Sequence, residues 1–154
     1  MTTQARTIKI LLLNTIIQLS ILVAGQGHLS SRLPMHVDFN GQITTTIANQ
    51  AHPFLHSAAL LVMFALVAIF LILTSTAIQS RFNTMLLNIN ALISRLCQLT
   101  AVFITIMAWI FLAIMLSGHV QLWLMLTNYL YVLGLIIIVG SWLYHLMQIN
   151  HSSK

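Results

Sequence analysis

A short stretch holds two side chains that could do chemistry, in a chain otherwise poor in such groups. His36 and Asp38 lie between Pro34 and Gly41, and Asp38 is the only acidic residue among 154. Proline fixes its own φ and disfavours helix at the residue before it. The pair Asn40 and Gly41 favours a turn, because both residue types tolerate positive φ. This stretch is therefore expected to run extended and then to turn.

Polar and apolar residues alternate in the extended part. Successive side chains of an extended segment point to opposite faces, so His36 and Asp38 are predicted to share one face. The opposite face holds three apolar residues, Met35, Val37 and Phe39. Further on, residues 44–46 are all threonine, which favours extended structure over helix.

Two roles that need no metal are open for the polar face. In the structural role, Asp38 pairs with Arg32 or accepts hydrogen bonds from backbone amides of a turn, and His36 packs beneath it. An exposed ion pair of this kind contributes about 0–1 kcal/mol. In the binding role, His36 and Asp38 form an outward-facing site at the membrane surface that recognises a peptide or a lipid head group. His52 or His56 could complete this site.

Metal binding is a third role for the same residues. His and Asp are zinc ligands, and the candidates are His36, Asp38, His52 and His56. The last two are four residues apart, which places them on one helix face if Pro53 occupies the first turn, where proline is tolerated. The sequence predicts no cofactor, and zinc at these residues is the alternative that it leaves open.

The spacing P-x-H-x-D-x-x-G resembles the short motif P-x-H-x-(N/D)-x-x-G of the DUF1648 family of bacterial membrane proteins. The motif positions are Pro34, His36, Asp38 and Gly41. In that family one transmembrane helix precedes the motif and a second follows it. The resemblance covers residues 10–74, about the first half of the chain. It implies a helix–loop–helix unit over residues 10–78, with these four residues as its motif or ligand-binding positions.

The resemblance also carries a functional expectation. The same domain occurs in immunity proteins, which protect bacteria from their own membrane-active peptide toxins, or bacteriocins. This chain departs from the family at Val37, where an aromatic residue is frequent, and at residues 44–46, where Lys or Trp is frequent. The further domain of those immunity proteins opens with a G-x-R-T-like sequence, of which residues 81–84 are only a faint echo.

Composition places the chain in a membrane. Hydrophobic residues make up 59% and charged residues 5%, whereas soluble domains carry about 25% charged residues. The six Lys and Arg residues are scattered, so they form no nucleic-acid footprint. A single acid excludes catalysis by paired carboxylates, and the sequence has no G-x-S-x-G, phosphate loop or H-E-x-x-H. We therefore expect no enzyme.

Four apolar segments predict an all-α, polytopic membrane protein. They cover residues 9–25, 58–78, 96–116 and 122–146, and about 20 residues cross a bilayer core. A signal peptide is the alternative interpretation of the first segment.

Residues 79–95 carry a helical pattern that predicts a surface-lying helix or a helical lead-in to the third span. Asn14 and Gln18 lie four apart and are expected to face other helices. The single membrane domain then comprises the unit 10–78 and two further spans within 79–154.

Charge bias predicts the orientation. Five Lys or Arg residues fall in the two tails and the middle connection, whereas the other two connections contain only Arg32. The positive-inside rule then puts both termini in the cytoplasm and the motif outside, and the resemblance implies a bacterial cell membrane.

From the resemblance we expect the protein to give immunity against a membrane-active peptide or to sense one. The alternative is an accessory subunit of a larger membrane transporter or assembly. The expected partners are membrane lipid and a peptide toxin or another membrane protein, and not nucleic acid.

Overall fold

Four long helices and one small β-hairpin make up the described part of the chain. The computed structural model describes residues 3–30, 32–48, 52–81, 87–117 and 120–152. The elements are helix α1 (Thr3–Ala24), a short 3₁₀ helix η1 (Gln26–His28), strands β1 (Arg32–Val37) and β2 (Ile43–Ala48), and helices α2 (Pro53–Arg81), α3 (Leu87–Ser117) and α4 (Gln121–Ser152). All four α-helices are long and apolar enough to cross a membrane. The chain is therefore a multi-pass membrane protein.

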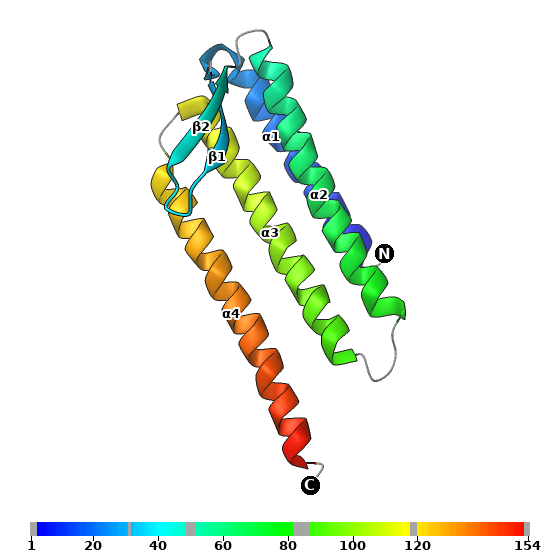
Figure 1. The fold of residues 1–154 in the computed structure, drawn as a ribbon. Helices are drawn as coiled ribbons and strands as arrows, with labels where there is room; N and C mark the ends of the chain where they lie inside the picture. The colour runs from blue at the N-terminus through cyan, green and yellow to red at the C-terminus, as the bar shows by residue number, and fades with distance from the viewer. Residues whose placement is uncertain (1–2, 31, 49–51, 82–86, 118–119, 153–154) are drawn as a thin grey trace.

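The helices run alternately up and down, with α3 between α2 and α4 (Figure 1). α3 packs most extensively on α2 and also contacts α4, whereas α1 lies mainly against α2. Figure 1 shows the hairpin and the start of α4 at one end of the bundle, and both termini toward the other end. The two connections that were predicted to share one side of the membrane thus lie at the same end of the bundle.

The helices extend beyond the predicted apolar segments. α1 begins at Thr3 rather than at residue 9, α2 begins at Pro53 rather than at residue 58, and α4 continues to Ser152. Hydropathy marks only the part of a helix that suits hydrocarbon, and hydrogen bonding of the helical backbone continues into the polar head-group region. The number and order of the spans are confirmed, and their ends are corrected outward.

The helical pattern over residues 79–95 is divided between two spanning helices. Residues 79–81 end α2 and residues 87–95 begin α3, while residues 82–86 lie outside the described part. The lead-in alternative is therefore confirmed for residues 87–95, and the surface-lying alternative is wrong there. Amphipathic periodicity did not separate the two, because a helix that packs one face on a neighbour has the same pattern as one that lies on lipid.

A polar network joins α2 to α3. The hydroxyls of Ser75 and Ser94 are fully buried and hydrogen-bonded to each other at 2.6 Å. Gln79 donates to Ser94, and Gln98 donates to Ser75 at 3.1 Å. Hydrocarbon offers no partner for these groups, so their mutual bonds fix how the two helices sit against each other.

α1 is held by the face that the sequence analysis singled out. The indole N–H of Trp109 on α3 donates to the Asn14 side-chain oxygen at 2.8 Å, and Gln18 is only 1% exposed. The prediction that these amides face other helices is confirmed. Toward the hairpin end, the apolar contact continues through a buried cluster of Leu22, Leu61, Ala108 and Leu112.

Candidate functional site

The predicted motif builds the turn of the β1–β2 hairpin. The N–H of Asp38 donates to the carbonyl of Gln42 at 2.9 Å, and the N–H of Gly41 donates to the carbonyl of Asp38 at 3.0 Å. Gly41 has φ of +79°, which glycine adopts without steric cost. A β-turn followed by a glycine in this conformation is a common three-residue hairpin loop. The turn predicted at Gly41 is therefore confirmed, and it depends on the positive φ for which glycine was expected there.

The carboxylate of Asp38 stabilises this turn. Its Oδ1 accepts a 2.7 Å hydrogen bond from the N–H of Gln42. Arg32, the other partner that the sequence offered, pairs with Ala48 at the open end of the hairpin. A strand of six residues separates the two ends by about 20 Å. Of the two structural alternatives for Asp38, the backbone amide is the partner observed, and the Arg32 ion pair is wrong.

The predicted alternation of faces does not continue through the motif. The strand ladder is irregular between Pro34 and His36 and again between His36 and Val37. β1 ends at Val37, so Asp38 already belongs to the turn. Bulges place two residues of one strand opposite one of the other and break the two-residue period. His36 and Asp38 therefore do not form one face of a regular strand, and the prediction of a shared face is corrected.

The hairpin turn is docked on the first turns of α4. A Cβ on Gly41 would lie 2.5 Å from the carbonyl oxygen of Gln121, so only glycine allows this approach. The side-chain amide of Asn128 donates to the carbonyl of Phe39 at 3.1 Å. The Phe39 ring meets Tyr129 edge-on, with ring centroids 4.9 Å apart. Two backbone contacts and one aromatic pair thus join the turn to α4.

Apolar packing supports the same junction. Val37 of β1 packs against a buried cluster formed by Ile110 and Ile114 of α3 and Leu124 of α4. Pro34 is also buried. β2, by contrast, is exposed along residues 43–46. β1 is therefore the strand that packs on the bundle, and β2 is the strand that faces outward from it.

A cleft of about 300 Å³ opens between the hairpin and the α3–α4 junction. It is lined by Gly41, Gln42, Ile43, Ile114, Val120, Gln121 and Leu124. Pockets for small molecules have volumes of about 300–1,000 Å³. This cleft is at the lower end of that range and suits one or two side chains of a peptide better than a bulky metabolite.

The histidines do not gather around the turn. His52 and His56 are exposed at the start of α2, where the N–H of His56 donates to the carbonyl of His52 at 3.2 Å and Pro53 is the first helical residue, as predicted. Figure 1 places the start of α2 near the open end of the hairpin, away from the turn that holds Asp38. The side chain of His36 lies outside the described part. Among the side chains that are described, no three His, Cys, Asp or Glu residues form a metal-binding group.

The residues of α4 that hold the hairpin were missed by sequence analysis. Gln121, Asn128 and Tyr129 lie in or beside the fourth predicted span, far along the chain from the motif. One signal was available for Asn128, because an amide within an apolar span requires a partner. Nothing in the local sequence, however, indicates that this partner is the carbonyl of Phe39.

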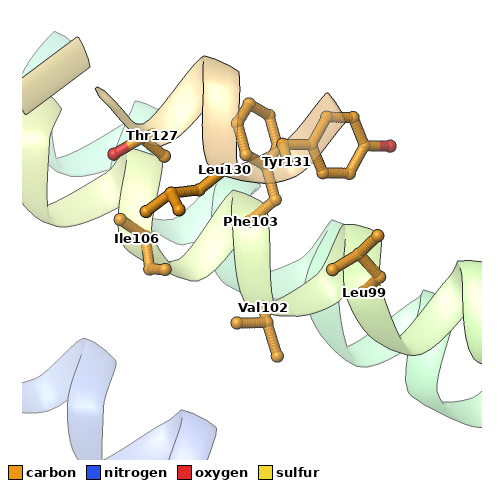
Figure 2. Close-up of a pocket in the computed structure, with 7 residues that line it drawn as sticks. All are labelled: Leu99, Val102, Phe103, Ile106, Thr127, Leu130 and Tyr131. Atoms are coloured by element: carbon orange, nitrogen blue, oxygen red, sulfur yellow. The ribbon is translucent and has the colours of Figure 1, made fainter. Parts of the chain in front are cut away.

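A second hollow lies between α3 and α4. It is an apolar groove of about 220 Å³ lined by Leu99, Val102, Phe103, Ile106, Thr127, Leu130 and Tyr131 (Figure 2). The rings of Phe103 and Tyr131 are stacked with centroids 4.3 Å apart, and the Tyr131 hydroxyl is hydrogen-bonded to Thr100 at 3.0 Å. With that hydroxyl already paired, the groove offers mainly carbon to its surroundings, as a lipid-facing groove does.

Comparison with known proteins gives no assignment. No family model matches this chain, and no curated protein or solved structure matches it.

Proposed function

We propose that this is a non-enzymatic membrane protein that protects a bacterial cell from, or senses, a membrane-active peptide through its hairpin. The observation that carries the proposal is the docking of the hairpin turn on α4 through Gly41 and Phe39. A hairpin held in this way is preorganised, so binding a partner costs little ordering entropy. The DUF1648-like spacing at residues 34–41 and the absence of a visible catalytic set in the sequence support the same proposal.

The hairpin offers a peptide two kinds of contact. Apolar contact comes from Phe39, which is 49% exposed, and from Ile43 beside the cleft. Polar contact comes from the half-buried carboxylate of Asp38. An ionised carboxylate has about four acceptor positions, and the bond to Gln42 uses one of them. A cationic side chain of a peptide can therefore pair with Asp38 while the turn stays intact.

Recognition of a cationic peptide has to be local. The formal net charge of the chain is +5, so its long-range field repels cations rather than attracting them. The peptide would first be concentrated by the membrane itself and would then meet the hairpin next to α4. This order of events suits peptides that act on membranes.

Asp38→Asn is the variant that tests this function. The amide oxygen can still accept the hydrogen bond from Gln42, so the turn is kept while the charge is lost. The measurement is the survival of sensitive cells that express the protein and are challenged with peptides encoded near its own locus. We expect Asp38→Asn to lose protection at unchanged accumulation in the membrane.

Two results would contradict the proposal. If protection and accumulation fall together, Asp38 serves only the structure. If the unmodified protein, at confirmed expression, changes survival with none of these peptides, protection is not its function. Gly27→Ala is the control, because a Cβ at Gly27 meets no atom within 4 Å, and it should protect like the unmodified protein.

The alternative function is that of an accessory subunit in a larger membrane assembly. One feature favours it: the described part of α4 packs mainly on α3, and its C-terminal part extends beyond the other helices in Figure 1. From the middle of α4 to its C-terminal end, the exposed apolar residues include Ile136, Ile137, Leu143 and Met147. Another membrane protein could cover this surface. Affinity purification from membranes followed by mass spectrometry would recover such a partner in stoichiometric amount.

A further inference from the structure

The depth of the hairpin turn along α4 follows from its contacts. Gly41 lies against Gln121, the first residue of α4, whereas Phe39 is bound to Asn128 and Tyr129. At 1.5 Å per helical residue, Asn128 lies about 10 Å further along α4 than Gln121. The turn therefore points back along the bundle, as Figure 1 also shows, and not away from it.

Aromatic residues of α4 indicate where the bilayer lies. Trp123 and Tyr144 are exposed near opposite ends of the helix, and the rise between them is about 32 Å. The hydrocarbon core of a bilayer is about 30 Å thick, and Trp and Tyr gather at its two interfaces. With Trp123 at one interface, Tyr129 and the Phe39 ring against it lie about 9 Å deeper. This depth matches the 5–10 Å to which interfacial segments bury their apolar faces.

The turn bonds many of its own backbone polar groups. The N–H and C=O of Asp38, the N–H of Gly41 and both backbone groups of Gln42 are hydrogen-bonded within the turn. The carbonyl of Phe39 is bonded to Asn128. Irregular backbone enters the edge of the hydrocarbon only where such groups have partners. The bonded groups of Asp38, Phe39, Gly41 and Gln42 suit a position at this edge.

The side chains that the turn presents suit the same position. Phe39 and Tyr129 are each 49% exposed. Asn40 and Gln42 beside them are exposed and uncharged, and the carboxylate of Asp38 is half-buried and hydrogen-bonded. The surface formed by Phe39, Asn40 and Tyr129 is called the hairpin tip below. Leu126 and Leu133, three and four residues from Tyr129 on the same face of α4, are also exposed.

We propose that the hairpin tip is a membrane anchor, seated in the bilayer at the boundary between head groups and acyl chains. Its partner is the lipid of the leaflet on the hairpin side. The anchor fixes the depth of α4 and of the hairpin turn in the bilayer. It does not depend on the proposed function, because it concerns only the protein and lipid.

Fluorescent probes on the turn test the anchor. In a Cys97→Ser background, Asn40→Cys is labelled with an environment-sensitive dye and the protein is reconstituted into phosphatidylcholine vesicles. We expect a blue-shifted emission, strong quenching by lipids that carry a nitroxide near the head group, and little quenching by aqueous iodide. Gln42→Cys, at an exposed neighbouring position, is a second probe if the first variant fails to fold.

Two matched positions calibrate the result. Thr45→Cys, exposed in the middle of β2, should be quenched by iodide, and Leu133→Cys, exposed within the span, should respond only to deep nitroxides. Adding Gly41→Ala should undock the turn and give the Asn40 probe the iodide quenching of the Thr45 probe. The proposal is overturned if the Asn40 and Gln42 probes are as open to iodide as the Thr45 probe, or if neither quencher reaches them, because protein would then cover the tip.

Discussion

The side-chain amide of Asn128 on α4 donates a 3.1 Å hydrogen bond to the carbonyl oxygen of Phe39 in the hairpin turn. The two residues are 89 positions apart in the sequence. The bond joins the motif-bearing first half of the chain to its last helix. A hairpin of two strands alone is marginally stable, so the contact with α4 is what makes this one a defined surface.

Gly41→Ala should undock the hairpin. Alanine at a φ of +79° is strained by about 1–2 kcal/mol. Its Cβ would also lie 2.5 Å from the backbone oxygen of Gln121, which has to move. We expect a total loss of about 1–3 kcal/mol, measured as unfolding free energy in detergent micelles, together with faster proteolysis of the hairpin.

Gly27→Ala is the matched control for this loss. It also adds one methyl group in the connection between α1 and α2, but into open space. Its stability should stay within about 0.5 kcal/mol of the unmodified protein. Equal effects of the two substitutions would show that the close approach of Gly41 to α4 does not contribute to stability.

Ser94→Ala should loosen the α2–α3 pair. The change removes a fully buried hydroxyl, which is bonded to the buried hydroxyl of Ser75 and accepts a hydrogen bond from the exposed side chain of Gln79. Hydrogen bonds between membrane helices contribute on average about 0.6 kcal/mol each, so a loss of about 1 kcal/mol is expected. Unfolding by a denaturing detergent measures it. Ser141→Ala, which removes a hydroxyl that donates to the Ile138 carbonyl of its own helix, should change little, and an equal loss there would contradict the interhelical role.

Zinc binding remains a prediction from the sequence, and the structure suggests how to dissect it. The purified protein is expected to hold about one equivalent of zinc by elemental analysis. Asp38 lies in the turn, whereas His52 precedes α2 and His56 lies in its first turn, so substitutions at the two places should have different effects on the zinc content. If His52 and His56 bind the metal, His56→Ala reduces the zinc content and Asp38→Asn does not. Reduction by His36→Ala as well would place His36 in the same site. Folded, metal-free protein that ignores added zinc would refute the prediction.

The fold was largely predictable where the cause is local. Pro53 opens α2, Gly41 turns the hairpin and residues 44–46 are extended in β2, each for reasons held within a few residues. Asn14 contacts another helix because an amide in hydrocarbon needs a partner. The irregular register around His36 was not predictable, because it depends on how the turn and the bundle constrain the two strands together.

The candidate site was only half predictable. The sequence located Asp38 and Gly41 but not their neighbours on α4, because contacts between segments far apart in the chain leave no periodic pattern. The polar network shows the same limit: Ser75 and Ser94 are ordinary residues in their own segments and become informative only when α2 and α3 are paired. The contacts of the motif with α4 depend on such pairings, and so they required the structure.

Membrane orientation is predicted from charge and can be tested at three positions. Five of the six Lys and Arg residues fall in segments assigned to the cytoplasm, and the positive-inside rule then places the hairpin and the start of α4 outside. In a Cys97→Ser background, a cysteine at Thr45 or at Gln121 should react with a membrane-impermeant maleimide added to intact cells. Both positions are exposed and lie at the hairpin end of the bundle. A cysteine at Ser153 should react only after the cells are permeabilised.

Labelling of Ser153 in intact cells, with Thr45 and Gln121 protected, would show the opposite orientation. The hairpin would then meet its partners from the cytoplasm, and protection against peptides that arrive from outside would no longer fit.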